Sequence, residues 1–171
     1  MLTLMIGGAG SGKSAFAEEL VCRLDGRRVY LATMEIADAE SRARVARHRA
    51  LRQGRGFETV ECSRNLPGAA IRPGANVLLE DLSNLLANEM FSPQGGGIVG
   101  LRRGLSDLIA RCRHLTVVTN EVFSDGVRYD EDSEKYLRAL AALNRELAAE
   151  AALAVEVVCG LPNVLKGELP W

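Results

Sequence analysis

Residues 7–14, Gly-Gly-Ala-Gly-Ser-Gly-Lys-Ser, have the G-x-x-x-x-G-K-S spacing of a phosphate-binding loop. They follow the apolar run 2–6 and precede a helical pattern over 13–24. Glycines let the backbone wrap closely around a polyphosphate with its N–H groups pointing inward. In such a loop Lys13 is expected to reach the β- and γ-phosphates, and the Ser14 hydroxyl to bind Mg²⁺. The predicted phosphate-binding residues are Gly7, Gly8, Ala9, Gly10, Ser11, Gly12, Lys13 and Ser14.

Two acids, Glu80 and Asp81, follow the apolar run 77–79, where a buried strand should end. A phosphate-binding loop needs an acid on the metal side, and this acid commonly lies at the end of another parallel strand. Ligands of parallel sheets bind at those strand ends. We therefore predict that Glu80 or Asp81 holds Mg²⁺ or a substrate hydroxyl, with Glu80 as the metal ligand beside Ser14. The alternative for Asp81 is that it caps the following helix.

A second strand end carries polar side chains in the run 117–121, Val-Val-Thr-Asn-Glu. Parallel strands end at one edge of a sheet, so this run should lie close to the Glu80 end. The alternative is ordinary turn chemistry, which asparagine favours.

The segment 37–55 is rich in arginine and has a helical pattern. Arg44, His48 and Arg52 are four residues apart and would share one face of that helix. Guanidinium groups suit a bound phosphate, and their charge should lower the pKa of a neighbouring imidazole and keep it neutral and nucleophilic. Composition alone favours a solvated basic face on which the histidine is incidental.

At 171 residues, with 47% hydrophobic and 25% charged residues, the chain fits one domain over 1–171. Lysine and arginine total 21 against 22 acids, so nothing points to nucleic acid or a membrane surface as partner. No apolar stretch approaches the roughly 20 residues of a membrane span, and there is no basic leader, so we expect a cytoplasmic protein. His114 should lie on the surface. No zinc-binding pattern is present, and four cysteines should be reduced, mostly buried thiols: Cys22, Cys62, Cys112 and Cys159.

Strand and helix patterns alternate along the chain, which predicts an α/β fold with a mostly parallel sheet and helices on both faces. Strands are expected at 2–6, 28–32, 57–61, 76–80, 115–119 and 154–159. Helices are expected at 13–24, 37–55, 82–91, 98–111 and 132–151. A polar loop at 122–131 precedes the last helix, and Gly160-Leu161-Pro162 opens an extended tail.

Taken together, these motifs resemble the adenosylcobinamide kinase / adenosylcobinamide-phosphate guanylyltransferase family of cobalamin biosynthesis. The resemblance runs nearly from end to end of the chain, and the order of its motifs is more specific than the phosphate-binding loop alone. The matching segments are 7–14, 30–33, 44–49, 59–61, 77–80, Asn88, 117–121 and 160–167.

The resemblance implies a RecA-like P-loop domain, a homotrimer and two activities. Such enzymes phosphorylate adenosylcobinamide with ATP or GTP, and then transfer GMP from GTP to that phosphate through a guanylylated histidine. The matching histidine is His48, which would act with Lys13 as a catalytic residue. Besides residues 7–14, the implied nucleotide contacts are Ala32, Thr33, Met34, Arg49, Ala50, Leu51, Arg52, Glu61 and Glu80.

The sequence departs from the familiar pattern at 122–132, at Phe57 in place of a common tryptophan, and at 81–83. These departures fall where we would place the corrinoid. Two alternatives therefore stand: a kinase of this family with one activity or another alcohol substrate, and a nucleotide-binding regulatory module. Gly54 and Gly56 could form a hinge for the segment that carries His48.

Overall fold

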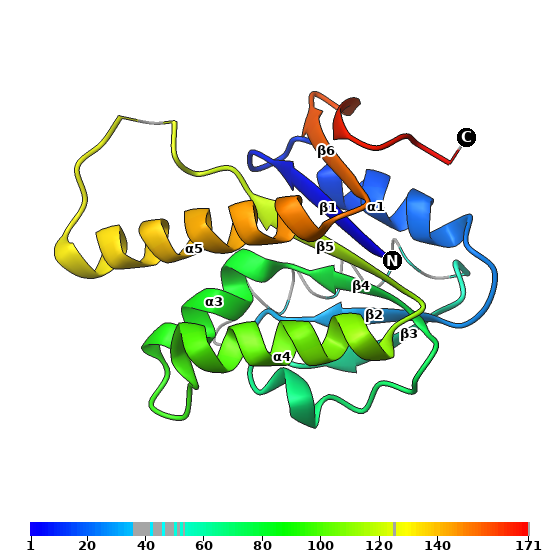
Figure 1. Ribbon diagram of the computed structural model, residues 1–171, viewed down its shortest axis with the longest axis horizontal. Coiled ribbons are helices and arrows are strands. Elements are labelled where there is room, and N and C mark those ends of the chain that lie inside the picture. The colour runs from blue at the N-terminus through cyan, green and yellow to red at the C-terminus, as the bar shows by residue number, and fades with distance from the viewer. Residues whose placement is uncertain are drawn as a thin grey trace.

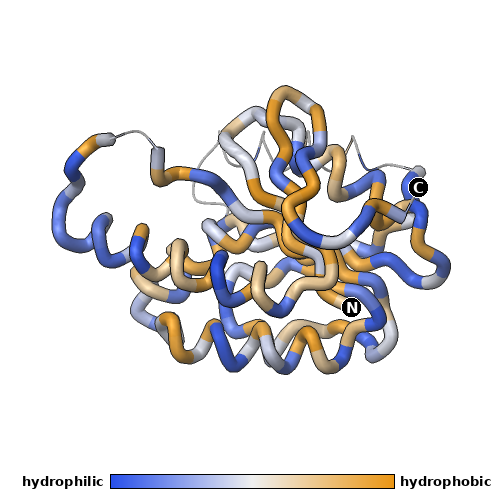
Figure 2. The backbone as a smooth tube through the Cα atoms, turned by 45° about the horizontal axis from the view of Figure 1, so that its top comes forward, coloured by the Kyte–Doolittle hydropathy of each residue, from blue (hydrophilic) through white to orange (hydrophobic). Residues whose placement is uncertain are grey.

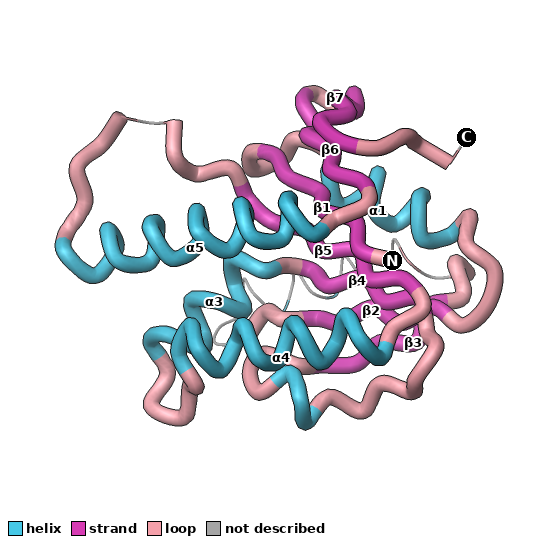
Figure 3. The backbone as a smooth tube through the Cα atoms, viewed as in Figure 1, coloured by secondary structure: helices cyan, strands magenta, loops and turns pink. Residues whose placement is uncertain are grey.

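The computed structural model describes residues 1–35, 42, 46, 50, 52, 54–124 and 126–170. A seven-stranded sheet runs through the middle of the molecule in the order β3-β2-β4-β5-β1-β6-β7 (Figures 1 and 3). The strands are β1 (Leu2–Gly7), β2 (Arg28–Ala32), β3 (Phe57–Glu61), β4 (Asn76–Glu80), β5 (His114–Asn120), β6 (Leu153–Val158) and β7 (Leu161–Lys166). The helices are α1 (Lys13–Cys22), η1 (Leu66–Gly68), α3 (Leu82–Phe91), α4 (Gly97–Arg111) and α5 (Glu131–Glu150).

Helices cover both faces of the sheet, and each face has its own apolar core. On one face α3, α4 and α5 pack through residues such as Leu85, Leu105 and Leu143, and α1 covers the other face through Leu20 and Val21. The inner strands β1, β2, β4, β5 and β6 are rich in apolar residues because both of their faces are buried, whereas the edge strands β3 and β7 are mostly exposed. Figure 2 shows the apolar centre. The predicted α/β fold with a mostly parallel sheet is confirmed.

Strands β1 to β6 are parallel, and β5 lies between β1 and β4. Only β5 therefore separates β1, which the phosphate-binding loop follows, from β4, which ends in the acid Glu80. Gly7 at the end of β1 is paired with Asn120 at the end of β5. The polar residues predicted at separate strand ends therefore meet at one edge of the sheet.

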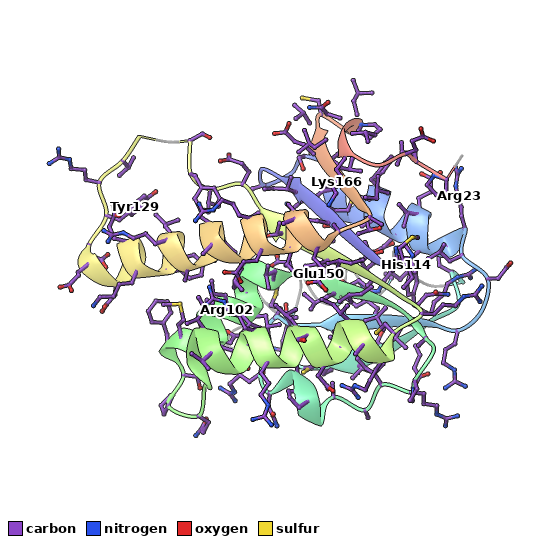
Figure 4. The ribbon with its side chains drawn as sticks, in the orientation of Figure 1. Arg23, Arg102, His114, Tyr129, Glu150 and Lys166 are labelled. Atoms are coloured by element: carbon purple, nitrogen blue, oxygen red, sulfur yellow. The ribbon has the colours of Figure 1, made fainter. Side chains whose placement is uncertain are left out.

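The predicted extended tail is instead a strand, β7, which is antiparallel to β6. Cys159 (φ 51°) and Gly160 (φ 79°) both have positive φ, as a tight two-residue hairpin turn requires. Pro162 suggested a chain leaving the sheet, but β7 is an edge strand, where a missing N–H donor is tolerated. The Lys166 ammonium donates to the carbonyl oxygens of Ala148 (3.1 Å) and Ala149 (2.7 Å) at the end of α5 (Figure 4).

Most predicted boundaries lie within two residues of the observed ones. The segment 37–55 lies largely outside the described residues; residues 42, 46 and 50 of it are helical. The prediction that the cysteines are mostly buried is wrong, because only Cys62 is buried and Cys159 is exposed at the β6–β7 turn.

The prediction of a surface position for His114 is also wrong. Its side chain is 5% exposed, and its Nε2 forms a hydrogen bond of 2.9 Å with the Thr3 hydroxyl (Figure 4 labels the residue). Strand β5 begins one residue earlier than predicted, so His114 belongs to the buried sheet rather than to the preceding connection. Burial, and then the nearby N-terminal ammonium, lower the pKa of His114 to about 4.

We expect His114 to make the protein less stable in acid. Its pKa in the folded state is below the ordinary value, so the unfolded chain takes up the proton first as the pH falls through about 6.5. Between about pH 7.5 and about pH 5 this should lower the free energy of unfolding by about 2 kcal/mol. Urea denaturation at both pH values would measure this difference in the free energy of unfolding.

The matched control is His114→Gln, which keeps a nitrogen able to bond Thr3 but cannot titrate. The difference between wild type and this variant isolates His114 from Glu80, whose raised pKa has the opposite effect on stability. Equal losses of stability in the two proteins would contradict the prediction.

Candidate nucleotide-binding site

The loop between β1 and α1 has the backbone geometry of a phosphate cradle. Gly10 (φ 71°) and Gly12 (φ 91°) adopt conformations that other residues rarely take. The Ser11 N–H donates to the Gly8 carbonyl (3.2 Å), which closes the turn. Lys13 begins α1; its side chain is 7% exposed, and its ammonium donates to the Gly8 carbonyl (3.1 Å) across the loop. The sequence therefore forms a compact, positively charged loop at a helix N-terminus, which suits an anion.

Gly7 lets this loop lie close to β6. A Cβ atom at position 7 would lie 2.6 Å from both the Ser11 hydroxyl oxygen and the carbonyl oxygen of Val157. Only glycine fits there without movement of backbone. Strand β6 thus sets the position of the loop from behind.

Ser14 and Glu80 meet directly under the loop. The Ser14 hydroxyl donates to Oε1 of Glu80 at 2.6 Å, although the two residues come from α1 and β4. The other oxygen, Oε2, is buried and has no hydrogen-bond partner among the described residues. Burial raises the pKa of Glu80 to about 7; the Ser14 hydrogen bond opposes this shift, and the Asp81 carboxylate adds to it.

This donor set fits a hard divalent cation. A hydroxyl and a carboxylate oxygen are ligands that Mg²⁺ prefers, and the unpartnered Glu80 oxygen is a free coordination position. A cation here would also favour the charged form of the buried carboxyl group.

Asp81 caps α3, as the alternative for this residue predicted. Its Oδ1 accepts from the Asn84 backbone N–H (2.7 Å), and its Oδ2 lies 3.3 Å from the Asn84 amide nitrogen and 3.4 Å from that of Asn120. Burial raises the pKa of Asp81, and the Asn84 hydrogen bond opposes this shift. The cap does not use all the acceptor capacity of this carboxylate, so it can also accept from a substrate hydroxyl.

The end of β5 lies at the same site. The Asn120 backbone N–H donates to the Ser83 hydroxyl (3.1 Å), and the Glu121 N–H donates to the Gly7 carbonyl (2.9 Å). The Glu121 carboxylate turns toward the following loop, where it accepts from the Phe123 N–H (3.0 Å). The prediction that these two strand ends lie together is confirmed.

Thr33 is fully buried, and its hydroxyl lies 2.9 Å and 2.8 Å from the carbonyl oxygens of Glu80 and Asp81. This side chain supports the end of β4 and is not open to a ligand. Ala32 and Met34 on either side are half-buried, so this segment can reach a nucleotide through them or through its backbone.

Asn88, which belonged to the matching motifs without an assigned role, ties the neighbouring strand ends together. Its amide nitrogen donates to the Thr33 carbonyl (2.9 Å) and to the Ser63 carbonyl (3.0 Å). We expect Asn88→Ala to lower the free energy of unfolding by about 2 kcal/mol, because two partly buried carbonyl groups lose their donor. Chemical denaturation would measure this loss.

The control is Asn163→Ala. Its amide makes only a longer, exposed contact of 3.3 Å with Glu156. A loss at Asn88 no larger than the loss at Asn163 would show that the two carbonyl bonds contribute little.

The described end of the arginine-rich segment is anchored on α1 and β2. The Arg52 guanidinium lies over the Tyr30 ring, 3.4 Å from its centroid, and Arg55 pairs with the buried Glu18 at 3.2 Å. Arg52 is 7% exposed, and its Nη1 has no hydrogen-bond partner in the part of the chain that the structure describes. Burial raises the pKa of Glu18, and Arg52 and then Arg55 oppose the shift.

The remaining predicted contacts are only partly placed. Ala50 is exposed, and Glu61 lies at the end of β3 on a cavity of about 930 Å³ beside α3 and η1. His48, Arg49 and Leu51 lie outside the described residues. Glu18 was not among the predicted site residues, although an acid beside the apolar residues Ala17, Leu20 and Val21 was a visible signal.

The strand order, the phosphate-binding loop and the half-buried hydroxyl–carboxylate pair of Ser14 and Glu80 together define a P-loop nucleotide-binding α/β protein. Residues 3–165 match the family model described as cobinamide kinase / cobinamide phosphate guanyltransferase. The chain belongs to this family.

Three bifunctional proteins are similar to this chain over nearly the whole length of both sequences. The chain is similar to the bifunctional adenosylcobalamin biosynthesis proteins CobU of Salmonella typhimurium (33% identity, covering 97% of this chain and 100% of the relative) and of Escherichia coli (34%, 97% and 100%). It is also similar to CobP of Pseudomonas aeruginosa (31%, 98% and 99%).

Among solved structures, it is similar to the P4 protein of bacteriophage phi6 in complex with ADP, with a TM-score of 0.48 and 17% identity. That likeness covers 96% of this chain and 52% of P4, so this chain spans about half of that protein's length. Within the described residues, no helix has the length and apolarity to cross a membrane.

Proposed function

We propose that this chain phosphorylates adenosylcobinamide with ATP or GTP, and then transfers GMP from GTP to the resulting phosphate, giving adenosylcobinamide-GDP. Family membership supports the pair of activities. The observation that carries the proposal is the 2.6 Å contact between Ser14 of the phosphate-binding loop and Glu80 of β4. It assembles, from two distant parts of the chain, the donor set that a nucleotide–magnesium complex needs.

In the kinase reaction, residues 7–14 hold the donor's phosphates through backbone N–H groups, and Lys13 places its charge on the β- and γ-phosphates. Ser14 and Glu80 would hold Mg²⁺, which would neutralise charge on the phosphate oxygens. The acceptor hydroxyl attacks the γ-phosphorus, the bond from this phosphorus to the β–γ bridging oxygen breaks, and the nucleoside diphosphate leaves. Asp81, half-buried directly after β4, accepts the hydroxyl proton in this proposal.

In the transfer reaction, a neutral His48 nitrogen attacks the α-phosphorus of GTP, an N–P bond forms, and pyrophosphate leaves. A phosphate oxygen of adenosylcobinamide phosphate then attacks the same phosphorus and releases His48. Arg52, which has a buried nitrogen without a hydrogen-bond partner among the described residues, supplies positive charge near the phosphates. The other nucleotide contacts of this proposal are Ala32, Met34, Arg49, Ala50, Leu51 and Glu61, whereas Thr33 supports the end of β4.

The first test is the intact mass of the protein after incubation with GTP and Mg²⁺, followed by addition of adenosylcobinamide and mass analysis of the corrinoid. We expect one GMP adduct on the protein, and then a corrinoid that carries GDP. A corrinoid that gains only phosphate, with no protein adduct, would identify a kinase with a single activity. Nucleotide binding without any product would favour the regulatory module.

A trimer is the assembly that we propose from the family resemblance. Sedimentation velocity with and without GTP measures it directly. A monomer under both conditions would contradict this part of the proposal.

A further inference from the structure

A groove lies between the loop after β5 and the first turns of α5. We call it the loop–α5 groove; it measures about 630 Å³, and its lining includes Glu121, Val122, Tyr129, Tyr136 and Leu137. Figure 1 shows this loop standing out from the rest of the molecule between the end of β5 and the start of α5.

The floor of this groove is bonded to the nucleotide site. The Glu121 N–H donates to the carbonyl of Gly7, the first residue of the phosphate-binding motif (2.9 Å). The Tyr136 hydroxyl donates to the Ser83 carbonyl (3.1 Å), two residues beyond Asp81. A ligand in the groove would therefore lie next to both the phosphate-binding loop and the acids that end β4.

The groove and its surroundings expose more apolar surface than a solvated loop needs. Val122, Phe123, Val127 and Tyr129 are each 38% to 57% exposed, and Phe91, whose ring lies 6.3 Å from that of Tyr136, is 56% exposed. Contiguous exposed apolar side chains of this kind mark binding sites.

Charge around the groove is predominantly negative. Glu121 lines it, and Asp130, Glu131 and Asp132 follow Tyr129 directly. The cations on this stretch are Arg128, Lys135 and Arg138, and two of them are paired with acids. Lys135 lies within 3.4 Å of both Glu131 and Asp132, and Arg138 lies 3.5 Å from Glu134. The groove therefore combines an apolar wall with an acidic border, which suits a large ligand that is apolar in body and positive in net charge.

We propose that the loop–α5 groove binds the corrin ring of the acceptor and that Val122 and Tyr129 are its specificity-determining contacts. A cobalt corrinoid is a broad, flat macrocycle with methyl groups on its edges and a net positive charge. With the ring in the groove, its aminopropanol arm extends toward the phosphate-binding loop. This inference rests on the proposed function, because it names where the acceptor of that reaction binds.

The cavity beside α1 does not offer this combination. It is bordered by Glu19, Arg28 and Arg55 and lies along the flank of α1. Its lining is charged with both signs, and it shares none of the apolar residues of the loop after β5.

The test is a double variant, Val122→Ser with Tyr129→Ser, assayed for phosphorylation of adenosylcobinamide. We expect the KM for the corrinoid to rise about tenfold while the Kd for the nucleotide and the melting temperature stay unchanged. Equilibrium dialysis, read by the visible absorbance of adenosylcobinamide, measures corrinoid binding independently of turnover. The matched control is Val99→Ser on α4, which removes an apolar side chain that is 74% exposed and far from the groove in sequence.

An active double variant whose KM for the corrinoid equals that of wild type and of the Val99 variant would overturn the inference. If wild type does not phosphorylate adenosylcobinamide, the proposed function fails, and dialysis then decides the groove separately. Corrinoid binding that the double variant loses would support the groove even so. Equal binding by both proteins, or none by wild type, would overturn it.

Discussion

Lys13→Met is expected to lower kcat/KM for phosphorylation of the acceptor about a thousandfold and to weaken guanylyl transfer as well. Lys13 is only 7% exposed, and its ammonium donates to the Gly8 carbonyl inside the loop. This ammonium is the cation that the motif supplies to the phosphates. Methionine nearly preserves the shape of the side chain and removes its charge. Steady-state kinetics with ATP and with GTP would measure the loss.

Folding of this variant has to be separated from its chemistry. Its melting temperature without nucleotide should be close to that of wild type, since the loop is held by backbone bonds such as Ser11 N–H to the Gly8 carbonyl. The matched control is Lys135→Met, at an exposed lysine of α5. If the Lys13 variant were as active as the Lys135 variant, the prediction that Lys13 contributes to catalysis would be wrong.

His48→Ala is expected to abolish guanylyl transfer, at least about ten-thousandfold, and to leave phosphorylation of adenosylcobinamide in place. The reason is that His48 forms a covalent bond only in the second reaction. Arg52, four residues further along, is anchored over Tyr30, so the end of this segment has a fixed attachment to the core. The measurement is the intact mass with GTP, with the corrinoid product followed in parallel.

The chain supplies its own control because it contains only two histidines. His114→Gln should retain the GMP adduct, since His114 is buried at the opposite end of β5 from the nucleotide site. An adduct that persists in the His48 variant would assign the nucleophile to another residue. Loss of phosphorylation together with transfer would show that His48 acts in both reactions.

The nucleotide loop and the strand ends around it could be predicted because their signals are local. A glycine pattern, an apolar run and the acid that follows it all lie within a few residues, and a parallel sheet then brings the ends of β1, β4 and β5 to one edge. The same reasoning predicted Ser14 and Glu80 as metal ligands, whose side chains are in contact in the structure, and offered the cap of α3 as the alternative for Asp81.

The features that were missed depend on contacts between distant residues. The strand β7 is held by pairing with β6 and by Lys166 at the end of α5, and neither is visible in its own residues. His114 is buried because it faces Thr3, more than a hundred residues earlier. Thr33 resembles a ligand contact in sequence, but in the structure its hydroxyl supports the end of β4.

The position of β1 in the sheet has a consequence for how the protein is made. This strand leaves the ribosome well before its two neighbours in the sheet, β5 and β6, which begin at His114 and Leu153. Until those strands are synthesised, the apolar residues of β1 have no partners in the sheet, and long-range pairing of this kind is slow. We therefore expect nascent chains that stop before β5 to lack a formed phosphate-binding loop and to need protection from aggregation.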